Sequence, residues 1–398
     1  MKSHLLSRWF CFFLFLFVSE TVFGQDSIWL AKTQGKYAFL EYGIGDERLG
    51  GAKMGYLDSN VLLKIVDSFF TDYKVKLSAA HSAYIAKESV SLIRKIANGR
   101  MIHNPLLTSS IKVYGEGNAD FVAISLPETA PYRTYQMIDP AEIVVEVFGV
   151  NSNTNWLAQM KTAKEIRNTW YDQPEDDVFR VHIELKHAQH WGHSAYYDST
   201  GKRLIIKVKR QPLVMDIRKM RIAIDAGHGG DNNGTSGVIH GVAEKHYTLM
   251  IAKELEKICK NAGVSQVFMT RTKDTILSMT ERLDLVRNFD PDFLVSIHLN
   301  SGASDTTQGV STYYRYIGFR PLTVYILNQL LMLGLKEYGN IGQFNFALNG
   351  PTDYPNALVE VAFLSNPADE KKINNPKFQK AVAQKIYLGM QDWIRSIR

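Results

Sequence analysis

The first half of the chain alternates hydrophobic and polar positions with a period of two, and this pattern predicts half-buried β-strands. Between Ser27 and about Ile96, short strand-like segments are separated by turns rich in Gly and Asp, such as GDERLGG. The segments are YAFLEYG, VLLKIVDSFF and YKVKLSA. Strands this short, with turns this frequent, predict a small all-β barrel.

A second stretch with the same alternation runs from about Ser110 to Arg210. Its strand-like segments are IKVYGE, DFVAISL, EIVVEVFGV, VFRVHIEL and RLIIKVKR. No helix-length amphipathic segment interrupts them. We therefore expect a second mostly-β unit to follow the first.

At Arg221 the pattern changes, because strand-like runs begin to alternate with helix-length amphipathic segments. The strand-like runs are RIAIDA, QVFMT, DFLVSIH, VSTYY and ALVEVAF. The predicted helices span Glu244–Ala262, Ser278–Asn288, Pro321–Tyr338 and about Phe378–Ile397. This alternation predicts an α/β domain with a mostly parallel open sheet and helices on both faces. The predicted fold class is therefore an α/β domain preceded by two small mostly-β domains.

The N-terminus has the features of a secretory signal peptide. Lys2 and Arg8 precede an apolar stretch from Trp9 to Val18, and the small Gly24 offers a cleavage site. These 10 apolar residues are fewer than the roughly 20 that a membrane-spanning helix needs. We therefore predict that residues 1–24 are a signal peptide and that the protein is exported; an uncleaved anchor that starts slightly earlier is the alternative.

The remaining chain divides into predicted domains at residues 25–105, 106–212 and 213–398, with QPLVMDIRKM as the linker before the third. Cys259 is the only cysteine left after signal cleavage, so no internal disulfide is expected. The 46 basic and 40 acidic residues give a net charge of +6, a weak bias toward an anionic partner. The sequence has no recognisable nucleic-acid-binding module and no later membrane-spanning stretch, so we expect neither a nucleic acid partner nor a transmembrane anchor.

Three of the predicted strands carry an unusual polar residue at or near their C-terminal ends. These residues are His228, His298 and Glu360. In open α/β sheets the C-terminal edge is where ligands bind. Glu360 is the most informative, because apolar residues surround it and a lone buried carboxylate is unfavourable. It needs a cation, a set of hydrogen bonds or a raised pKa.

Glu244 follows His228 by 16 positions (244 minus 228), across a glycine-rich loop, and begins a predicted helix. One interpretation is a carboxylate that complements the helix dipole. The other is a metal ligand, since glycines let the loop fold tightly enough to bring Glu244 beside His228. Two imidazoles and one carboxylate, with a fourth position left to water, are typical of a catalytic zinc site. His228, Glu244 and His298 are therefore candidate ligands for Zn²⁺.

Four further residues are candidates to bind substrate or to support the ligands through hydrogen bonds: Asn300, Asp225, His240 and His246. His240 and His246 flank Glu244, and their spacing also leaves them open as ligands. Asn300 is otherwise a turn residue that ends a strand. The histidines of KHAQHWGHS recur every third residue, and we expect them in an exposed turn. The loop GHGGDNNG lacks the features of a phosphate-binding motif.

The segments IAIDAGHGGDNNGTSG…EK, SIHLN and NALVEVAFLSN occur in order between Arg221 and Arg398. With TRTKD and GVSTYY between them, they resemble the zinc-dependent N-acetylmuramoyl-L-alanine amidases of the amidase-3 type. The resemblance implies that His228, Glu244 and His298 hold zinc and that Glu360 is the catalytic glutamate. Departures from the usual motifs are Ala226, Val361-Ala362 and Asn288-Phe289, none of which removes a ligand.

The implied reaction is hydrolysis of the peptidoglycan amide between N-acetylmuramic acid and the L-alanine of the stem peptide, with a zinc-bound water as nucleophile. Two alternatives stay open: a zinc peptidase or deacetylase that acts on another envelope amide, and a non-catalytic wall-binding protein. Some relatives carry an inserted helix that blocks the site. The interval from His298 to Glu360 is only 62 positions (360 minus 298), which predicts an open site without an activator.

The N-terminal segments carry resemblances of their own. LGGAKMGYLDSNVLLKIV, YKVKL and AYIAKESVSLI, within residues 25–105, are similar to bacterial SH3-like domains. DPAEIVVEVFGV, IRNTWYDQ, VFRVHIELK and RLIIKVKR, within residues 106–212, resemble the AMIN domain, a β-sandwich that targets envelope enzymes to peptidoglycan or the division site. The expected partners are peptidoglycan and division-site or envelope proteins, and the expected location is the periplasm or cell envelope.

Overall fold

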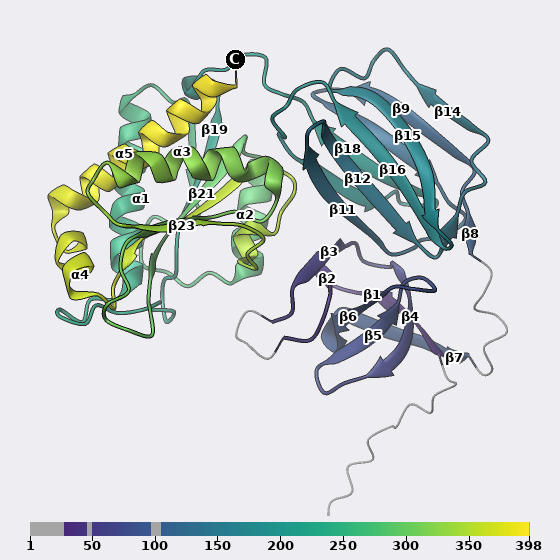
Figure 1. The fold of residues 1–398 in the computed structure, drawn as a ribbon, viewed down its shortest axis with the longest axis horizontal. Coiled ribbons are helices and arrows are strands. Elements are labelled where there is room, and N and C mark those ends of the chain that lie inside the picture. Colours follow the sequence, from purple (N-terminus) through teal and green to yellow (C-terminus); the bar gives the residue numbers. More distant parts are fainter. Residues whose placement is uncertain (1–27, 46–49, 97–104, 398) are drawn as a thin grey trace, which may run out of the picture.

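The computed structural model describes residues 28–45, 50–96 and 105–397. Figure 1 shows two β-rich units on one side of the molecule and a unit of helices around a sheet on the other. The predicted signal peptide, residues 1–24, lies outside the described residues. Among the helices described, none is long and apolar enough to cross a membrane.

The first unit is one antiparallel sheet with the strand order β3-β2-β6-β5-β4-β1-β7. Its strands are β1 (Ile28–Thr33), β2 (Ala38–Glu41), β3 (Lys53–Leu57), β4 (Leu62–Ser68), β5 (Asp72–Lys76), β6 (Ser82–Ala86) and β7 (Val90–Ile96). Alternate residues along β4, Leu63 and Ile65, are buried, as the period-two pattern predicts. This unit supplies β3, which reaches the C-terminal domain.

The second unit consists mainly of two antiparallel-rich sheets, ordered β14-β9-β10-β18-β17 and β11-β12-β16-β15. The strands of the first are β9 (Ser110–Glu116), β10 (Ala119–Ser125), β14 (Trp156–Gln159), β17 (His193–Tyr197) and β18 (Arg203–Lys209). Those of the second are β11 (Tyr132–Ile138), β12 (Ala141–Phe148), β15 (Ile166–Glu175) and β16 (Val178–Leu185). The short strands β8 (Leu106–Leu107) and β13 (Val150–Asn151) pair with each other.

One continuous hydrophobic cluster joins these two β-rich units. It includes Leu63 and Ile65 of the first unit together with Ile143, Val181 and Val208 of the second. Burial of apolar surface is the main stabilising contribution to folding, so a shared cluster couples the stability of the two units. We refer to residues 28–45, 50–96 and 105–209 together as the N-terminal β body.

The C-terminal domain contains a six-stranded sheet with the order β20-β19-β21-β24-β22-β23. Its strands are β19 (Arg221–Ala226), β20 (Gln266–Met269), β21 (Phe293–Asn300), β22 (Val310–Tyr313), β23 (Glu337–Ile341) and β24 (Asn356–Phe363). Its α-helices are α1 (Glu244–Asn261), α2 (Met279–Phe289), α3 (Arg320–Leu331), α4 (Pro367–Ile373) and α5 (Pro376–Ser396). Neighbouring strands are parallel except for β22, which runs antiparallel to β24.

Alternate residues of β19 face opposite layers of this domain. Ile222 and Ile224 share a hydrophobic cluster with residues of α1, α3 and α5. Ala223 belongs to a separate cluster with Leu283 and Val286 of α2. Helices thus cover both faces of the sheet, and α2 lies on the face nearer the N-terminal β body (Figure 1).

The predicted fold class is wrong for the chain. The structure is strand-rich, with 41% strand and 23% helix, and antiparallel sheets make up the N-terminal region. One hydrophobic cluster spans both β-rich units. The C-terminal sheet is mostly parallel, with a single antiparallel pairing between β22 and β24. Period-two patterns show that strands form, but they do not show which units share a core.

The predicted helix Pro321–Tyr338 is also wrong in its second half. The helix ends at Leu331, and residues Glu337–Ile341 form β23, parallel to β22. Gly334 adopts a positive φ of 71°, a conformation that ends helices and that glycine adopts without strain. This strand was not expected from the sequence, because its five residues come directly after a helical pattern and contain no apolar run.

The segment Gln189–His193 of the N-terminal β body packs against the C-terminal domain. Trp393 Nε1 of α5 donates to Gln189 Oε1 at 3.1 Å, and the His193 N–H donates to the Thr352 carbonyl at 2.7 Å. The exposed turn expected for the three histidines is therefore wrong for His190 and His193, which are buried. Burial lowers the pKa of His190 to about 4 and that of His193 to about 3.

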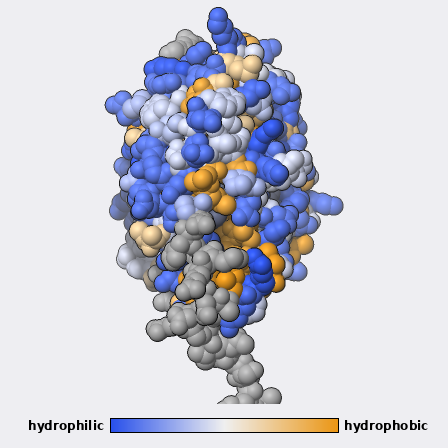
Figure 2. Space-filling model, turned by 90° about the vertical axis from the view of Figure 1, so that its right-hand side faces the viewer, coloured by the Kyte–Doolittle hydropathy of each residue, from blue (hydrophilic) through white to orange (hydrophobic). Residues whose placement is uncertain are grey.

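Apolar side chains gather on the side of the N-terminal β body that faces the viewer in Figure 2. The strands β8 and β14, which lie on that side in Figure 1, carry the exposed Leu107 and Trp156. This apolar surface points away from the C-terminal domain.

Candidate functional site

Four polar residues from different elements line one cavity of about 580 Å³ in the C-terminal domain. His228 follows β19, Glu244 is the first residue of α1, His298 lies in β21 and Glu360 lies in β24. The strands β21 and β24 are neighbours, with His298 and Glu360 paired in register. The strand order of the sheet therefore brings together residues that are as many as 132 positions apart (360 minus 228).

Glu244 lies between the two imidazoles. Its Oε2 is 3.1 Å from His228 Nε2, and its Oε1 is 3.0 Å from His298 Nδ1. The ligand atoms of the three residues all lie within 4.8 Å of one another, close enough to share one ion. In the part of the chain that the structure describes, this is the one group of three or more such residues with that spacing.

The carboxylate of Glu244 is also fixed by the backbone. Its Oε2 accepts from the Thr235 N–H at 3.0 Å, and its Oε1 accepts from the Leu299 N–H at 2.9 Å. Burial alone would raise the pKa of Glu244, but the hydrogen bonds to His228 and His298 outweigh it and hold the pKa well below its usual range. Glu244 is therefore a rigid, ionised acceptor.

Glycines let the chain approach these three side chains closely. At Gly234, which has a φ of 67°, a Cβ would lie 2.3 Å from Glu244 Oε2. At Gly227, a Cβ would lie 2.4 Å from the His298 ring. A side chain at either position would collide with Glu244 or His298, which explains part of the glycine content of this loop.

His228 has a positive φ of 62°, which is unusual for a residue with a Cβ. Two contacts hold it in place. Its Nδ1 is 2.9 Å from Asn232 Oδ1, which directs Nε2 toward Glu244, and its carbonyl accepts a hydrogen bond from Arg282 Nη2. The surrounding structure therefore determines the orientation of this imidazole.

Arg282 is fully buried beneath the loop, and it was missed by the sequence analysis. Its Nη1 donates to Asp225 Oδ1 at 2.5 Å and to the Ala226 carbonyl at 2.9 Å. Asp225 also accepts from Thr270 Oγ1 at 2.6 Å and from Ser296 Oγ at 2.7 Å. The structure thus places Asp225 under the site, as a support for the loop. The signal for Arg282 was its position next to Leu283 on the apolar face of a predicted helix.

Three aromatic residues form one side of the cavity, and we call Tyr313, Phe344 and Phe346 the aromatic wall. The rings of Phe344 and Phe346 lie 4.6 Å apart, and that of Tyr313 lies 4.9 Å from Phe344. The Phe346 ring is parallel to that of His298, at 6.4 Å with an interplanar angle of 11°. Asn300 Nδ2 donates to Tyr313 Oη at 3.3 Å, so Asn300 lines the cavity beside the wall.

The first β unit holds the segment that carries this wall. Asn345, between the two phenylalanines, donates from Nδ2 to the Gly51 carbonyl at 2.7 Å. Its Oδ1 accepts from the Lys53 N–H at 3.3 Å and from Arg315 Nη1 at 3.1 Å. Arg315 Nη2 also donates to the Lys53 carbonyl. Residues near the start of the chain therefore position one side of the cavity.

The structure does not bring His240 and His246 into the group. His240 Nδ1 lies 3.2 Å from Glu370 Oε1, and Glu370 Oε2 accepts from the Ile239 N–H at 2.6 Å. His246 lies on the exposed side of α1. Glu370 of α4, which the sequence analysis missed, therefore anchors the loop that leads into Glu244. The sequence offers no signal for this contact, since 126 positions separate Glu370 from Glu244 (370 minus 244).

Residues 222–392 match the Amidase_3 family model, described as N-acetylmuramoyl-L-alanine amidase. The chain is 32% identical over 176 residues to a probable cell wall amidase, LytH, of Staphylococcus epidermidis, covering 44% of this chain and 58% of that protein. It thus spans little more than half the length of that relative. It is 25% identical over 366 residues to the N-acetylmuramoyl-L-alanine amidase AmiC of Neisseria meningitidis serogroup B, covering 69% of this chain and 88% of that protein.

Among solved structures, the chain is similar to the crystal structure of N-acetylmuramoyl-L-alanine amidase from Clostridium difficile 630, at 33% identity and a TM-score of 0.43. The match covers 45% of this chain and 98% of that one.

We expect Arg282→Met to destabilise the protein by about 3–5 kcal/mol, because it leaves the buried Asp225 without its cation. Equilibrium unfolding in urea measures this loss. The matched control is Arg218→Met, which removes an exposed partner of Asp216 and should destabilise the protein far less. Equal losses in the two variants would contradict the role assigned to Arg282.

We expect Asn345→Ala to loosen the aromatic wall, because it removes the hydrogen bonds to Gly51, Lys53 and Arg315. Hydrogen–deuterium exchange of the Phe344 amide, which donates to the Tyr314 carbonyl, should become faster by about tenfold. Asn345→Asp keeps the acceptor and should show a smaller change. Unchanged exchange in Asn345→Ala would show that the wall is held without the first β unit.

Proposed function

With residues 222–392 matched by the amidase family model, we propose that the protein is a peptidoglycan hydrolase. It cleaves the amide between N-acetylmuramic acid and the L-alanine of the stem peptide. The observation that carries this proposal is the convergence of His228, Glu244, His298 and Glu360 on one cavity within the matched region. These four residues are those that the sequence motifs single out.

The donor set of the cavity fits Zn²⁺. Two imidazoles and one carboxylate are typical of catalytic zinc sites, and their ligand atoms lie within 4.8 Å of one another. His228, Glu244 and His298 would hold the ion, with Asn232 fixing the His228 ring through Nδ1. When bound, zinc supplies a Lewis acid that polarises the amide carbonyl and makes water more acidic.

Glu360 acts as the general base and acid of the proposed reaction. It lies on the strand next to His298, and its carboxylate accepts a proton from the attacking water. The same carboxyl then donates that proton to the nitrogen of the leaving L-alanine. Glu360 is 7% exposed and has apolar neighbours in β24, so the cavity shields this exchange from bulk solvent.

The aromatic wall and Asn300 orient the substrate in this proposal. Tyr313, Phe344 and Phe346 offer apolar surface to the sugar and the lactyl group, and Asn300 offers an amide to the stem peptide. The chain between His298 and Glu360 forms β22, α3, β23 and two short 3₁₀ helices, Ile317–Phe319 and Ala347–Asn349. We infer that the site accepts substrate without an activator.

The protein acts outside the cytoplasm in this proposal, in the periplasm or cell envelope, after cleavage of the signal peptide at residues 1–24. The cell wall amidases among its relatives support an extracytoplasmic location. Residues 213–398 perform the catalysis. The units at 25–105 and 106–212, with their SH3-like and AMIN-like sequence features, position the enzyme on peptidoglycan or near division-site proteins.

We expect Glu360→Gln to lower kcat by at least 10²-fold, because the amide can neither accept the proton of water nor return it. The zinc content of the purified variant should stay near that of the unsubstituted protein. Release of soluble fragments from purified sacculi measures the activity, and metal analysis measures the zinc. Full lytic activity in Glu360→Gln would exclude it as the base.

We expect a chelator to abolish digestion of sacculi and added Zn²⁺ to restore it. Mass spectrometry of the digest should then show stem peptides with a free L-alanine amino terminus, the product that this cleavage alone gives. Peptides cut at another amide, or sugars that have lost acetyl groups, would indicate a zinc peptidase or a deacetylase. Activity that persists without metal would contradict the zinc proposal.

A further inference from the structure

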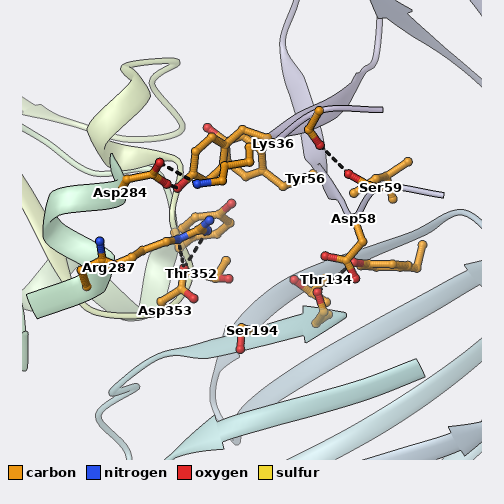
Figure 3. A pocket seen from close by; sticks show the side chains of 18 residues that line it. Lys36, Tyr56, Asp58, Ser59, Thr134, Ser194, Asp284, Arg287, Thr352 and Asp353 are labelled. Carbon is orange, nitrogen blue, oxygen red and sulfur yellow. Dashed lines mark hydrogen bonds and ion pairs between the residues drawn. The ribbon is translucent and has the colours of Figure 1, made fainter. Parts of the chain in front are cut away.

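A second cavity, of about 390 Å³, lies where the three units meet. Its lining comes from β3 and the adjoining turns of the first unit, from β11 and β17 of the second, and from α2 and residues 352–353 of the C-terminal domain. Figure 3 shows side chains from all three units around this space. The volume lies within the range of about 300–1,000 Å³ typical of small-molecule sites, which often form at domain junctions.

The charged groups of this cavity are largely engaged with one another. Lys36 Nζ lies 2.8 Å from Asp284 Oδ2, and the Tyr37 hydroxyl donates to Asp284 Oδ1 at 2.5 Å. Arg287 Nη2 lies 2.9 Å from Asp353 Oδ2, and its guanidinium lies 4.6 Å from the centre of the Tyr37 ring. Because both cations already have carboxylate partners, the cavity offers little to an anionic ligand.

Hydrogen-bond acceptors and aromatic faces dominate the rest of the lining. Asp58 is partly buried, and its Oδ2 accepts from the Tyr197 N–H at 2.7 Å. Burial raises the pKa of Asp58 above its usual value, so further donors would stabilise its charged form. Tyr56 contributes ring surface, Ser194 contributes a hydroxyl, and the almost fully buried Tyr132 lies behind them in the lining.

These features together select for a neutral, polyhydroxylated ligand. Hydroxyl groups donate to carboxylates that keep spare acceptor sites, and the apolar face of a sugar ring packs on a phenol ring. We propose that this junction cavity binds a pyranose unit of a neutral glycan strand, an inference that rests on the proposed function. The site is separate from the one that carries His228 and Glu360.

The two cavities draw on the same helix and the same chain segment, although no residue lines both. Helix α2 contributes Met279 and Arg282 to the catalytic cavity, and Asp284 and Arg287 to the junction cavity. The chain that follows Leu348 of the catalytic cavity reaches Asp353 of the junction cavity five residues later (353 minus 348). A sugar held in the junction cavity would help to bring the lactyl amide of the same glycan strand to the cavity that carries His228 and Glu360.

The test is calorimetric titration of the full exported chain with tetra-N-acetylchitotetraose, a neutral glycan without a peptide. We expect saturable binding that Asp58→Asn weakens by about tenfold or more, since this change replaces a charged acceptor but keeps an oxygen for the Tyr197 N–H. Ser194→Phe, which fills the cavity, should weaken binding to a similar extent. The matched control is Asp67→Asn, an exposed carboxylate of β4 in the same unit, which should bind as the unsubstituted protein does.

Thermal unfolding of each variant shows whether it still folds. If Ser194→Phe does not fold, Asp58→Asn alone tests the proposal. Absence of saturable binding, or equal affinity in Asp58→Asn and the control, would overturn the glycan site. The outcome is distinct from that of the proposed function, because chitotetraose has no amide to the lactyl group. A protein that binds this glycan but leaves muramoyl peptides intact would refute the amidase proposal alone.

A kinetic measurement separates substrate binding from catalysis. On sacculi, Asp58→Asn should raise KM about tenfold with kcat unchanged, whereas Glu360→Gln lowers kcat. A fall in kcat with KM unchanged would contradict a role for the junction cavity in holding the strand.

Discussion

The geometry of the cavity that carries His228 and Glu360 depends on one buried carboxylate, that of Glu244. It contacts His228 through one oxygen and His298 through the other, and backbone N–H groups of Thr235 and Leu299 hold the same two oxygens. A buried carboxylate that is so fully hydrogen-bonded is rigid as well as ionised. The fold of the domain maintains this arrangement, because the start of α1, the end of β19 and the C-terminal half of β21 meet at this carboxylate.

The sequence pattern alone singles out four residues that the structure brings together around one cavity. His228, His298 and Glu360 stand out because polar side chains at the ends of apolar strands require a reason, and Glu244 follows a loop whose glycines allow close approach. Strand order then brings these residues together. By contrast, Arg282, Asn345 and Glu370 act through contacts with residues distant along the chain. The place of Arg282 on the apolar face of a helix indicates burial, but a single sequence does not show which distant residues these three side chains contact.

The fold was harder to predict from the sequence than the candidate site residues were. Alternation of apolar and polar residues predicts strands, but it does not show that Leu63 and Val208 belong to one cluster. That fact depends on how two sheets pack, which many sequence patterns satisfy equally well. The predicted helix ends early, at Leu331, because Gly334 adopts a left-handed backbone conformation. The strand that follows is stabilised by pairing with β22. Tertiary pairing outweighed the local helical pattern there.

The contact between the first β unit and the aromatic wall is made on one side entirely by main-chain atoms. Asn345 and Arg315 reach the carbonyl of Gly51 and both the N–H and the carbonyl of Lys53, and no side chain of β3 takes part in these bonds. These bonds therefore place no demand on the side chains of β3, whose Met54 and Leu57 serve the hydrophobic cluster of the N-terminal β body instead. Exposed residues of the first unit can change during evolution without disturbing the aromatic wall, provided that Asn345 and Arg315 persist.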